Sequence, residues 1–315
     1  MMTEPTKGVV AMVAACTIWG MGTLFYDLIA HVPPLEVLCH RTTWSLVFFG
    51  CILIFQRRMT EVWSLFREPK SCFVVVFAAL MISVNWFLFI YSIQKVQTIQ
   101  SSLGYYIFPL AAVLMGFVLF GERLSKPKLF AVSLAALAVL VLTIGLGVAP
   151  WISLILAFTF GLYGVMKKMS GARPIVSVTA EVLILSPLAI VWLAGVHLYG
   201  WGGAQGQISG AFLGNWRDSL VLIASGPITA VPLVLLSYAS KRITMASVGV
   251  VQYLNPSLQF VFAVMFFEEV LTPSHAIAFP MIWLALAIYS AEAIRQERAA
   301  RRASQSSVTV ETTVT

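Results

Sequence analysis

Three side chains that could bind or transfer charge open an apolar run near the N-terminus: Glu36, His40 and Arg41. Glu36 and His40 are spaced i, i+4, so a helix would place them on one face, with Arg41 beside them. Asp27 closes the preceding apolar run, across a short connection. If the run spans a membrane, Arg41 lies about 10 Å inside it and must snorkel outward or pair with Asp27 or Glu36. The spacing favours a structural ion cluster, with an external gate or an anchor for an anionic solute as the alternative.

Glu181 is an acid well inside another apolar run, at residues 174–195. An intramembrane acid is costly unless it is paired, protonated or in contact with water. It is therefore either a proton-linked or cation-binding carboxylate, or a neutral or Arg-paired acid that holds helices together. The first interpretation predicts that Glu181→Gln abolishes pH-dependent transport without reducing the protein level.

Aromatic and amide side chains that could line a solute cavity recur at similar depth in the apolar runs, namely Trp19, Asn85, Trp86, Tyr105, Tyr253 and Asn255. Rings supply contact area and cation–π attraction, and amides fix the orientation of a small amphipathic solute. The alternative for the rings is ordinary packing. For Asn85, a helix–helix hydrogen bond fits as well as a ligand contact.

Two prolines occupy matching positions, Pro109 and Pro256, each about 15 Å into an apolar run and so near the middle of a bilayer. A proline removes a backbone donor and leaves a carbonyl unpaired, which at that depth must face protein or a wet cavity. The pair predicts hinges beside a carbonyl-lined site, or else static kinks.

The composition of the 315-residue chain places these residues in a membrane protein. Hydrophobic residues make up 59% and charged residues 10%, whereas soluble domains carry roughly 25% charged residues. The net charge of +7 comes from short basic clusters between apolar runs, which argues against nucleic acid as a partner and for membrane lipid. The four histidines lack ligand spacing, the four cysteines form no CxxC pair, and no nucleotide-binding or catalytic motif occurs, so we expect no metal, no cofactor and no enzyme activity.

Ten apolar runs are long enough to span a bilayer: residues 7–29, 35–55, 72–94, 98–120, 127–146, 150–167, 174–195, 218–240, 246–267 and 273–293. Of the 20 Lys and Arg residues, all but Arg41, Lys95 and Arg217 fall on the N-terminal side of the membrane. The positive-inside rule then predicts that both termini are cytoplasmic, in a multi-pass protein of a bacterial inner membrane. Short interfacial helices are expected within 56–71 and 196–217.

Residues 102–122 and 247–269 share an order of Ser-X-Gly, then Pro, then Glu, with 13 residues from Pro to Glu in both. This repeat predicts an all-α protein of two five-helix repeats. Because five is odd, the second repeat is inverted, an arrangement typical of alternating-access transporters. The predicted domains are an N-terminal segment (1–6), the first repeat (7–146), the second repeat (147–295) and a disordered cytoplasmic tail (296–315).

Five stretches of the chain resemble the EamA-type drug/metabolite transporters, most closely the RarD branch: residues 19–20, 36–44, 85–90, 102–109 with 121–123, and 252–256 with Glu269. The resemblance covers residues 7 to 295. It implies ten helices in two inverted repeats, export or facilitated movement of a small metabolite or drug, and no cofactor. It leaves the oligomeric state open, a homodimer included, and proton coupling as well.

One residue departs from the pattern of the resembled branch. The branch usually has Asn before the proline of the fourth span, where this chain has Phe108. If that Asn contacts solute, the specificity of this chain differs. The function expected from the sequence is export of a small solute by alternating access. The alternative is an integral-membrane enzyme acting on a lipid or isoprenoid substrate, which would need a polar catalytic cluster at one interface.

Overall fold

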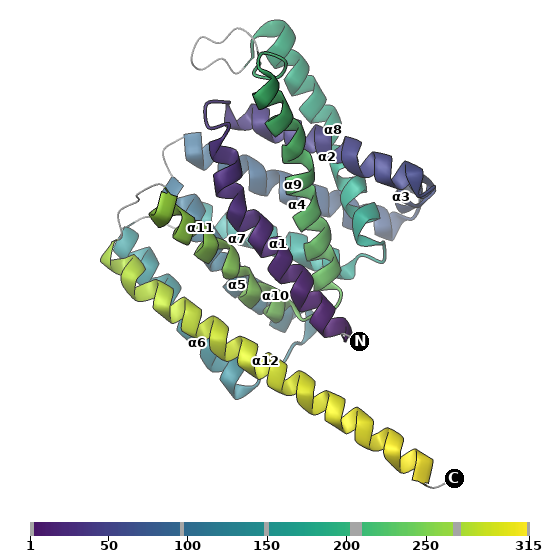
Figure 1. Cartoon of the computed structure of the whole chain (residues 1–315), viewed down its shortest axis with the longest axis vertical. Coiled ribbons are helices and arrows are strands. Elements are labelled where there is room, and N and C mark those ends of the chain that lie inside the picture. The colour runs from purple at the N-terminus through teal and green to yellow at the C-terminus, as the bar shows by residue number, and fades with distance from the viewer. Residues whose placement is uncertain (1–2, 95–97, 148–150, 202–209, 267–271, 314–315) are drawn as a thin grey trace.

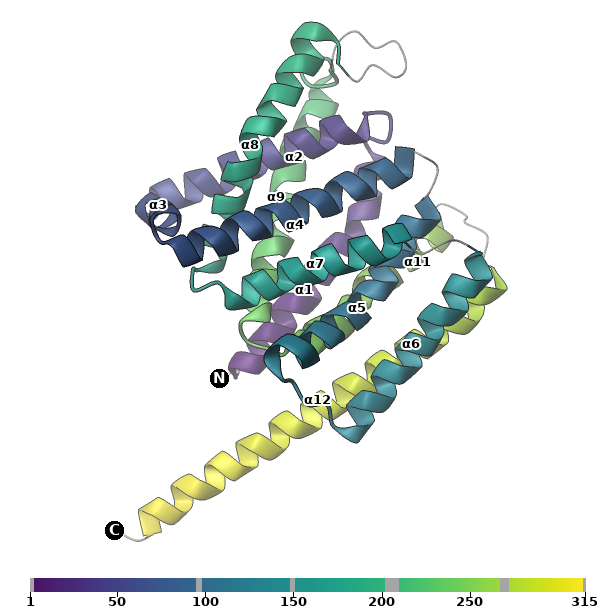
Figure 2. The ribbon, with the colours of Figure 1, turned by 180° about the vertical axis from the view of Figure 1, so that it is seen from behind.

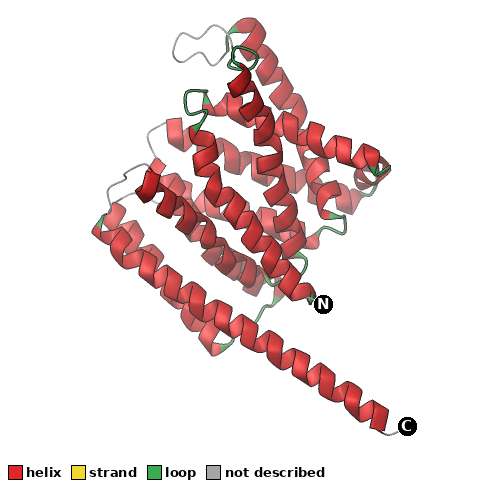
Figure 3. Ribbon diagram, viewed as in Figure 1, coloured by secondary structure: helices red, strands yellow, loops and turns green. Residues whose placement is uncertain are grey.

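The computed structural model describes residues 3–94, 98–147, 151–201, 210–266 and 272–313. Within these ranges the chain forms helices joined by turns (Figure 3). The helices are α1 (Glu4–Asp27), α2 (Pro34–Phe55), α3 (Met59–Arg67), α4 (Pro69–Gln94), α5 (Thr98–Phe120), α6 (Lys126–Leu146), α7 (Trp151–Met169), α8 (Pro174–Tyr199), α9 (Trp216–Ser240), α10 (Met245–Gln252), α11 (Leu254–Phe266) and α12 (Pro273–Thr313). The predicted all-α class is confirmed.

Local sequence explains where many of these helices begin and end. Thr3, Asn215 and Thr244 precede α1, α9 and α10, and each accepts a hydrogen bond from a backbone N–H of the first turn. Prolines occupy the first turn of α1, α2, α6 and α8, where no N–H partner is lost. Gly147 and Gly200 end α6 and α8 in the left-handed conformation, which glycine adopts without strain.

The helices match the predicted spans closely. Eight described helices are long and apolar enough to cross a membrane, and residues 104–120 form a shorter apolar helix. The ninth predicted span is filled by α10 and α11 together. The short helix expected within 56–71 is present as α3, whereas residues 202–209 of the other expected interfacial segment lie outside the described residues.

The two matched prolines shape their helices differently. Pro109 lies inside the continuous helix α5. The helix is interrupted only at Tyr253, between α10 and α11 and three residues before Pro256, and Tyr253 keeps right-handed helical angles (φ −59°, ψ −20°). A proline ring clashes with the carbonyl four residues earlier, here that of Gln252, so a break at this position is the expected effect.

The helices of the two halves pack in matching pairs (Figures 1 and 2). Helix α5 packs on α7, and its counterpart five spans later, α10 with α11, packs on α1. In the same way α1 packs on α9, and α7 packs on α4. Helices α2 and α8 pair with each other, as do α6 and α12. Exchanging the first five spans for the last five therefore preserves the main helix contacts, as two repeats require.

The bundle has two ends, which we name by their turns. At the α1–α2 end, Glu36 contacts Ala211 and His31 contacts Asp218. At the α7–α8 end, Glu122 contacts the start of α10 and Arg242 contacts Glu4 at the start of α1. Because α1 and α9 each run from one set of contacts to the other, these are opposite faces of the bundle.

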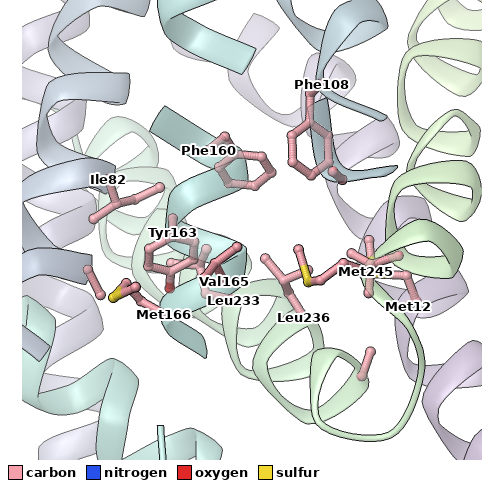
Figure 4. Close-up of a cluster of buried hydrophobic side chains, with 14 of the residues drawn as sticks. Met12, Ile82, Phe108, Phe160, Tyr163, Val165, Met166, Leu233, Leu236 and Met245 are labelled. Atoms are coloured by element: carbon pink, nitrogen blue, oxygen red, sulfur yellow. The ribbon is translucent and has the colours of Figure 1, made fainter. Parts of the chain in front are cut away.

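A cluster of buried apolar side chains draws on helices of both halves (Figure 4). By residue count, its members lie between the middle of their helices and the α7–α8 end. We call it the apolar seal; its labelled members are Met12, Ile82, Phe108, Phe160, Tyr163, Val165, Met166, Leu233, Leu236 and Met245. The Phe108 ring packs edge-on against Phe160, with 4.8 Å between centroids. The departure at position 108 therefore adds an apolar ring to this seal.

The C-terminal segment differs from its prediction. Sequence analysis expects disorder over 296–315, but α12 continues beyond the predicted tenth span to Thr313. Residues 295–303 are Arg, Gln, Glu and Ala, which are strong helix formers and explain why the helix extends beyond the span. Residues 304–313 are mostly Ser, Thr and Val, and their composition does not explain the last turns.

Candidate functional site

Arg41 of α2 lies over the indole ring of Trp86 of α4, with its Cζ 4.3 Å from the ring centroid. Its Nε is buried without a hydrogen-bond partner. Among the residues that the structure describes, no acid forms an ion pair with Arg41, and the expected pair with Asp27 or Glu36 is not formed. A cation–π contact contributes about 0.5–2 kcal/mol but leaves the in-plane N–H donors of the guanidinium unused.

Two further aromatic side chains lie near this cation. Tyr105 of α5 is within electrostatic reach of Arg41. Trp44 is three residues after Arg41 on the same helix face, and its Nε1 is also buried without a partner. Arg41, Trp86 and Tyr105 come from three helices, and each is about 10–12 Å from the α1–α2 end of its own helix by residue count. The arrangement offers unused N–H donors beside aromatic faces, which suits a carboxylate on an amphipathic solute.

The other residues predicted to bind solute lie elsewhere. Asn85 is buried, and its Nδ2 donates to the Leu156 carbonyl at 2.8 Å and to Thr159 Oγ1 at 3.1 Å, both on α7. This is the helix–helix alternative. Trp19 packs edge-on against Phe160 of the apolar seal, with centroids 5.9 Å apart.

Tyr253 and Asn255 flank the break between α10 and α11. The Tyr253 hydroxyl is buried without a partner, and Asn255 Oδ1 accepts a hydrogen bond from Gln259 one turn later on α11. These two residues belong to the interrupted helix, not to the group around Arg41.

Each matched proline directs its carbonyl toward the other half of the chain. A Cβ on Gly249 of α10 would lie 2.5 Å from the Pro109 oxygen, so Gly249 permits close approach of α10 to α5. The Pro256 oxygen accepts a long hydrogen bond, 3.5 Å, from the Tyr106 hydroxyl of α5. Both proline carbonyls thus face protein at the crossing of α5 with α10 and α11. The carbonyls that lose their helical donor are those four residues earlier, of Tyr105 and Gln252, and their predicted role beside a site stays a prediction.

Glu181 is part of a buried polar network between α7 and α8. It forms an ion pair with Lys167 and accepts hydrogen bonds from the Tyr163 hydroxyl and the Ser177 hydroxyl, each at 3.0 Å. Lys167 also donates to Ser177 at 2.9 Å. Every contact matches a paired acid that joins two helices. The partner is a lysine and not the expected arginine. Sequence analysis missed Lys167 because it counted this last residue of the sixth predicted span among the basic residues on the cytoplasmic side.

Glu122 ties the end of α5 to two other elements at the α7–α8 end. Its carboxylate accepts from the backbone N–H groups of Met245 and Ala246, at 2.8 and 3.0 Å, and pairs with Lys168 at 2.7 Å. A carboxylate at a helix N-terminus is stabilised by the helix dipole. Glu122 is thus a contact between the two halves.

Glu36 and His40 share one face of α2, as their spacing predicts. Glu36 Oε1 lies 3.9 Å from His40 Nε2 and accepts a hydrogen bond from the Ala211 N–H at 2.7 Å. The fold also brings His197, at the end of α8, beside His40, with ring centroids 6.2 Å apart. No sequence spacing links residues 40 and 197, so only the packing of α2 on α8 reveals this neighbour.

Comparison with known proteins gives a consistent result. Residues 6–144 match the model of the EamA-like transporter family. Protein RarD of Streptomyces exfoliatus is 37% identical over 298 residues, covering 95% of this chain and 92% of the relative. Protein RarD of Escherichia coli (strain K12) is 33% identical, covering 94% and 97%. The uncharacterized transporter YojE of Bacillus subtilis (strain 168) is 32% identical, covering 95% and 98%.

A solved crystal structure has the same fold. It superposes with a TM-score of 0.67 over 90% of this chain and 96% of the other chain, at 18% sequence identity. That identity supports the likeness of fold alone.

Proposed function

Because this chain belongs to the EamA family of transporters, in its RarD branch, we propose that it exports a small carboxylate-bearing solute by alternating access. Membrane transport of a small solute is the activity that the family and the names of the relatives indicate. The export direction is the one that the resemblance to drug/metabolite exporters implies. The substrate class rests on the residues around Arg41.

The observation that carries the substrate class is the guanidinium of Arg41. It stacks on Trp86 and has no acidic partner among the described residues. A guanidinium pairs with a carboxylate through two parallel N–H donors, and the low dielectric of the membrane strengthens that pair. Trp86 and Tyr105 supply apolar faces for the rest of the solute.

Two features support alternating access. The matching helix pairs place α5 against the broken helix α10–α11 at the centre, where two repeats would rock against each other. The apolar seal and the Glu122 contacts close the α7–α8 end, while Arg41 lies on the α1–α2 side of the bundle. In the predicted orientation the closed end is cytoplasmic, so this arrangement corresponds to a form in which solute leaves toward the outside.

The test is flux into and out of proteoliposomes, with and without a pH gradient. Each solute of an aromatic carboxylate panel is paired with its methyl ester, which has the same rings and no negative charge. We expect the wild type to move carboxylates and not their esters. Arg41→Gln should reduce carboxylate flux about 10- to 100-fold, since a hydrogen bond to a charged group contributes about 1.5–3 kcal/mol.

Two variants control for charge and for general damage. Arg41→Lys keeps the charge without the planar fork and should retain part of the flux. Arg58 immediately precedes α3 and pairs with Glu61 in its first turn, so Arg58→Gln should leave flux unchanged. Equal flux of esters and carboxylates, or wild-type flux in Arg41→Gln, would overturn the assigned substrate class.

A further inference from the structure

We propose that Glu36, His40 and His197 form a binding site for one divalent transition-metal ion, with Zn²⁺ as the fitting probe, at the α1–α2 end of the bundle. One ligand atom from each of the three residues lies within 4.8 Å of the others. Glu36 and His40 come from the first turns of α2, and His197 comes from the last turn of α8. The site therefore joins two helices that are far apart in sequence.

The chemistry of the three side chains matches transition metals. Two imidazoles and one carboxylate, with a fourth position open, form a common ligand set for Zn²⁺. Mg²⁺ and Ca²⁺ prefer all-oxygen ligands, so the two imidazoles select against them. Ligand atoms around a tetrahedral Zn²⁺ are about 3.3 Å apart. The 3.9 Å between Glu36 Oε1 and His40 Nε2 needs only a small side-chain adjustment to reach that separation.

An unpartnered nitrogen points independently to a ligand. His40 is only 4% exposed, and its Nε2 is buried without a hydrogen-bond partner. A buried polar atom in that condition costs about 1–3 kcal/mol. A metal ion bound to Nε2 would remove this cost, and Nε2 lies 3.9 Å from Glu36 Oε1.

The surroundings are shaped to hold the two other ligands in place. The Ala211 N–H donates to Glu36 Oε1 at 2.7 Å and so orients the carboxylate, as outer-shell partners of metal ligands do. Gly210 fits closely between the ligands, since a Cβ there would lie 2.8 Å from both Glu36 Oε1 and His197 Nδ1. Any larger residue at 210 would fill the space between the carboxylate and the imidazole.

Packing and access also suit an ion. The ring of Phe212 packs against the His40 imidazole, with centroids 4.8 Å apart. His197 is exposed, so an ion can reach the site from solvent without crossing the bundle.

The binding test uses the full-length protein in detergent, purified through an affinity tag without histidine. Co²⁺ is titrated as a coloured substitute for Zn²⁺, and Zn²⁺ is then added to displace it. We expect one Co²⁺ per chain, with the intense visible absorption of a tetrahedral ion. His197→Ala should weaken binding by at least the ~10–100-fold that loss of an outer-shell partner already causes.

His197 is the most informative position, because its exposed side chain can be truncated without leaving a buried cavity. His31→Ala is the matched control, since His31 lies at the same end but pairs with Asp218, and it should bind Co²⁺ like the wild type. Absence of stoichiometric Co²⁺ binding in the wild type, or unchanged binding in His197→Ala, would overturn the site.

A bound ion would also act on transport, a consequence that rests on the proposed function. It would pin α2 of the first repeat to α8 of the second, and these helices must separate or slide if the repeats rock. We expect Zn²⁺ on the α1–α2 side to inhibit flux in the wild type and not in His197→Ala. Stoichiometric Co²⁺ binding without inhibition of flux by Zn²⁺ would overturn the proposal that the ion holds α2 to α8, while the metal site itself would stand. Absence of flux without metal would overturn the transport proposal alone, because Co²⁺ binding is measured separately.

Discussion

Lys167 and Glu181 are opposite charges that are both removed from solvent, with exposed fractions of 0% and 2%. Removing one member of a buried ion pair leaves an unpaired charge and typically costs ~3–5 kcal/mol, whereas replacing both members is often close to neutral. The Tyr163 and Ser177 hydroxyls also donate hydrogen bonds to the Glu181 carboxylate, so loss of that carboxylate would leave these two donors without it as an acceptor. These contacts make a structural role testable against the predicted coupling role.

Glu181→Gln should therefore lower the melting temperature of the purified protein and its level in the membrane, because the Lys167 ammonium stays buried without its partner. The double variant Lys167→Gln with Glu181→Gln should recover most of that loss. Differential scanning fluorimetry in detergent and quantitative immunoblotting measure the two effects. A Glu181→Gln protein of wild-type stability that has lost only the pH dependence of flux would instead favour the coupling role.

Single residues show which contacts sequence can predict. The i, i+4 spacing correctly places Glu36 and His40 on one face, and Asn85 correctly appears as a polar group that needs a partner inside the membrane. The identity of that partner, α7, depends on which helices pack together. The same holds for His197 beside His40 and for Arg41 on Trp86, since each contact joins elements whose pairing no local pattern encodes.

At the scale of elements, hydropathy and capping residues determine most helix limits, so these are predictable from sequence. The break at Tyr253 and the continuity of α5 are not, although both helices carry a matched proline. The neighbouring contacts distinguish them. Gly249 lets α10 approach the Pro109 carbonyl, and the Tyr106 hydroxyl reaches the Pro256 carbonyl.

Gly249→Ala should destabilise the crossing of α5 and α10 by ~1–3 kcal/mol, the usual range for overpacking. The added Cβ would meet the backbone oxygen of Pro109, which cannot move without shifting the helix. Gly164→Ala is the control, because its Cβ would meet only the flexible tip of Met245, at 3.1 Å. Thermal melting of both variants in detergent checks the difference. Equal melting temperatures would mean that the close crossing contributes little.

At the scale of the whole molecule, the contacts at the α7–α8 end hold elements of both halves together. Glu122 alone connects the end of α5, the end of α7 through Lys168, and the start of α10. The Pro-to-Glu spacing that ends at Glu122 recurs in the second half and predicts two repeats. Sequence could not indicate that Glu122 reaches α7 and α10, because those contacts depend on how the helices pack.

Glu122→Gln should loosen the α7–α8 end by removing the charge that pairs with Lys168 and caps α10. A cysteine placed by Ser170→Cys, in a background without the four native cysteines, reports access at this end. We expect its reaction with a membrane-impermeant thiol reagent to be about 2- to 30-fold faster in Glu122→Gln, corresponding to ~0.5–2 kcal/mol for a carboxylate at a helix N-terminus.

Glu4→Gln provides the comparison, since the Glu4–Arg242 pair lies at the same end but is largely exposed and should contribute little. Equal reaction rates in the Glu122→Gln protein and its parent would show that the end stays shut without this carboxylate.

Helix α12 has 41 residues, which at 1.5 Å each amounts to about 60 Å, twice the ~30 Å thickness of the hydrocarbon layer. It leaves the bundle as a straight arm beyond the start of α1 (Figure 1). Four arginines, at positions 295, 298, 301 and 302, follow the predicted tenth span, where the positive-inside rule predicts the cytoplasmic surface of the membrane. Anionic phospholipid would attract this basic stretch. The fraction of anionic lipid in the membrane would therefore affect how strongly the end of the tenth span is held at the membrane surface.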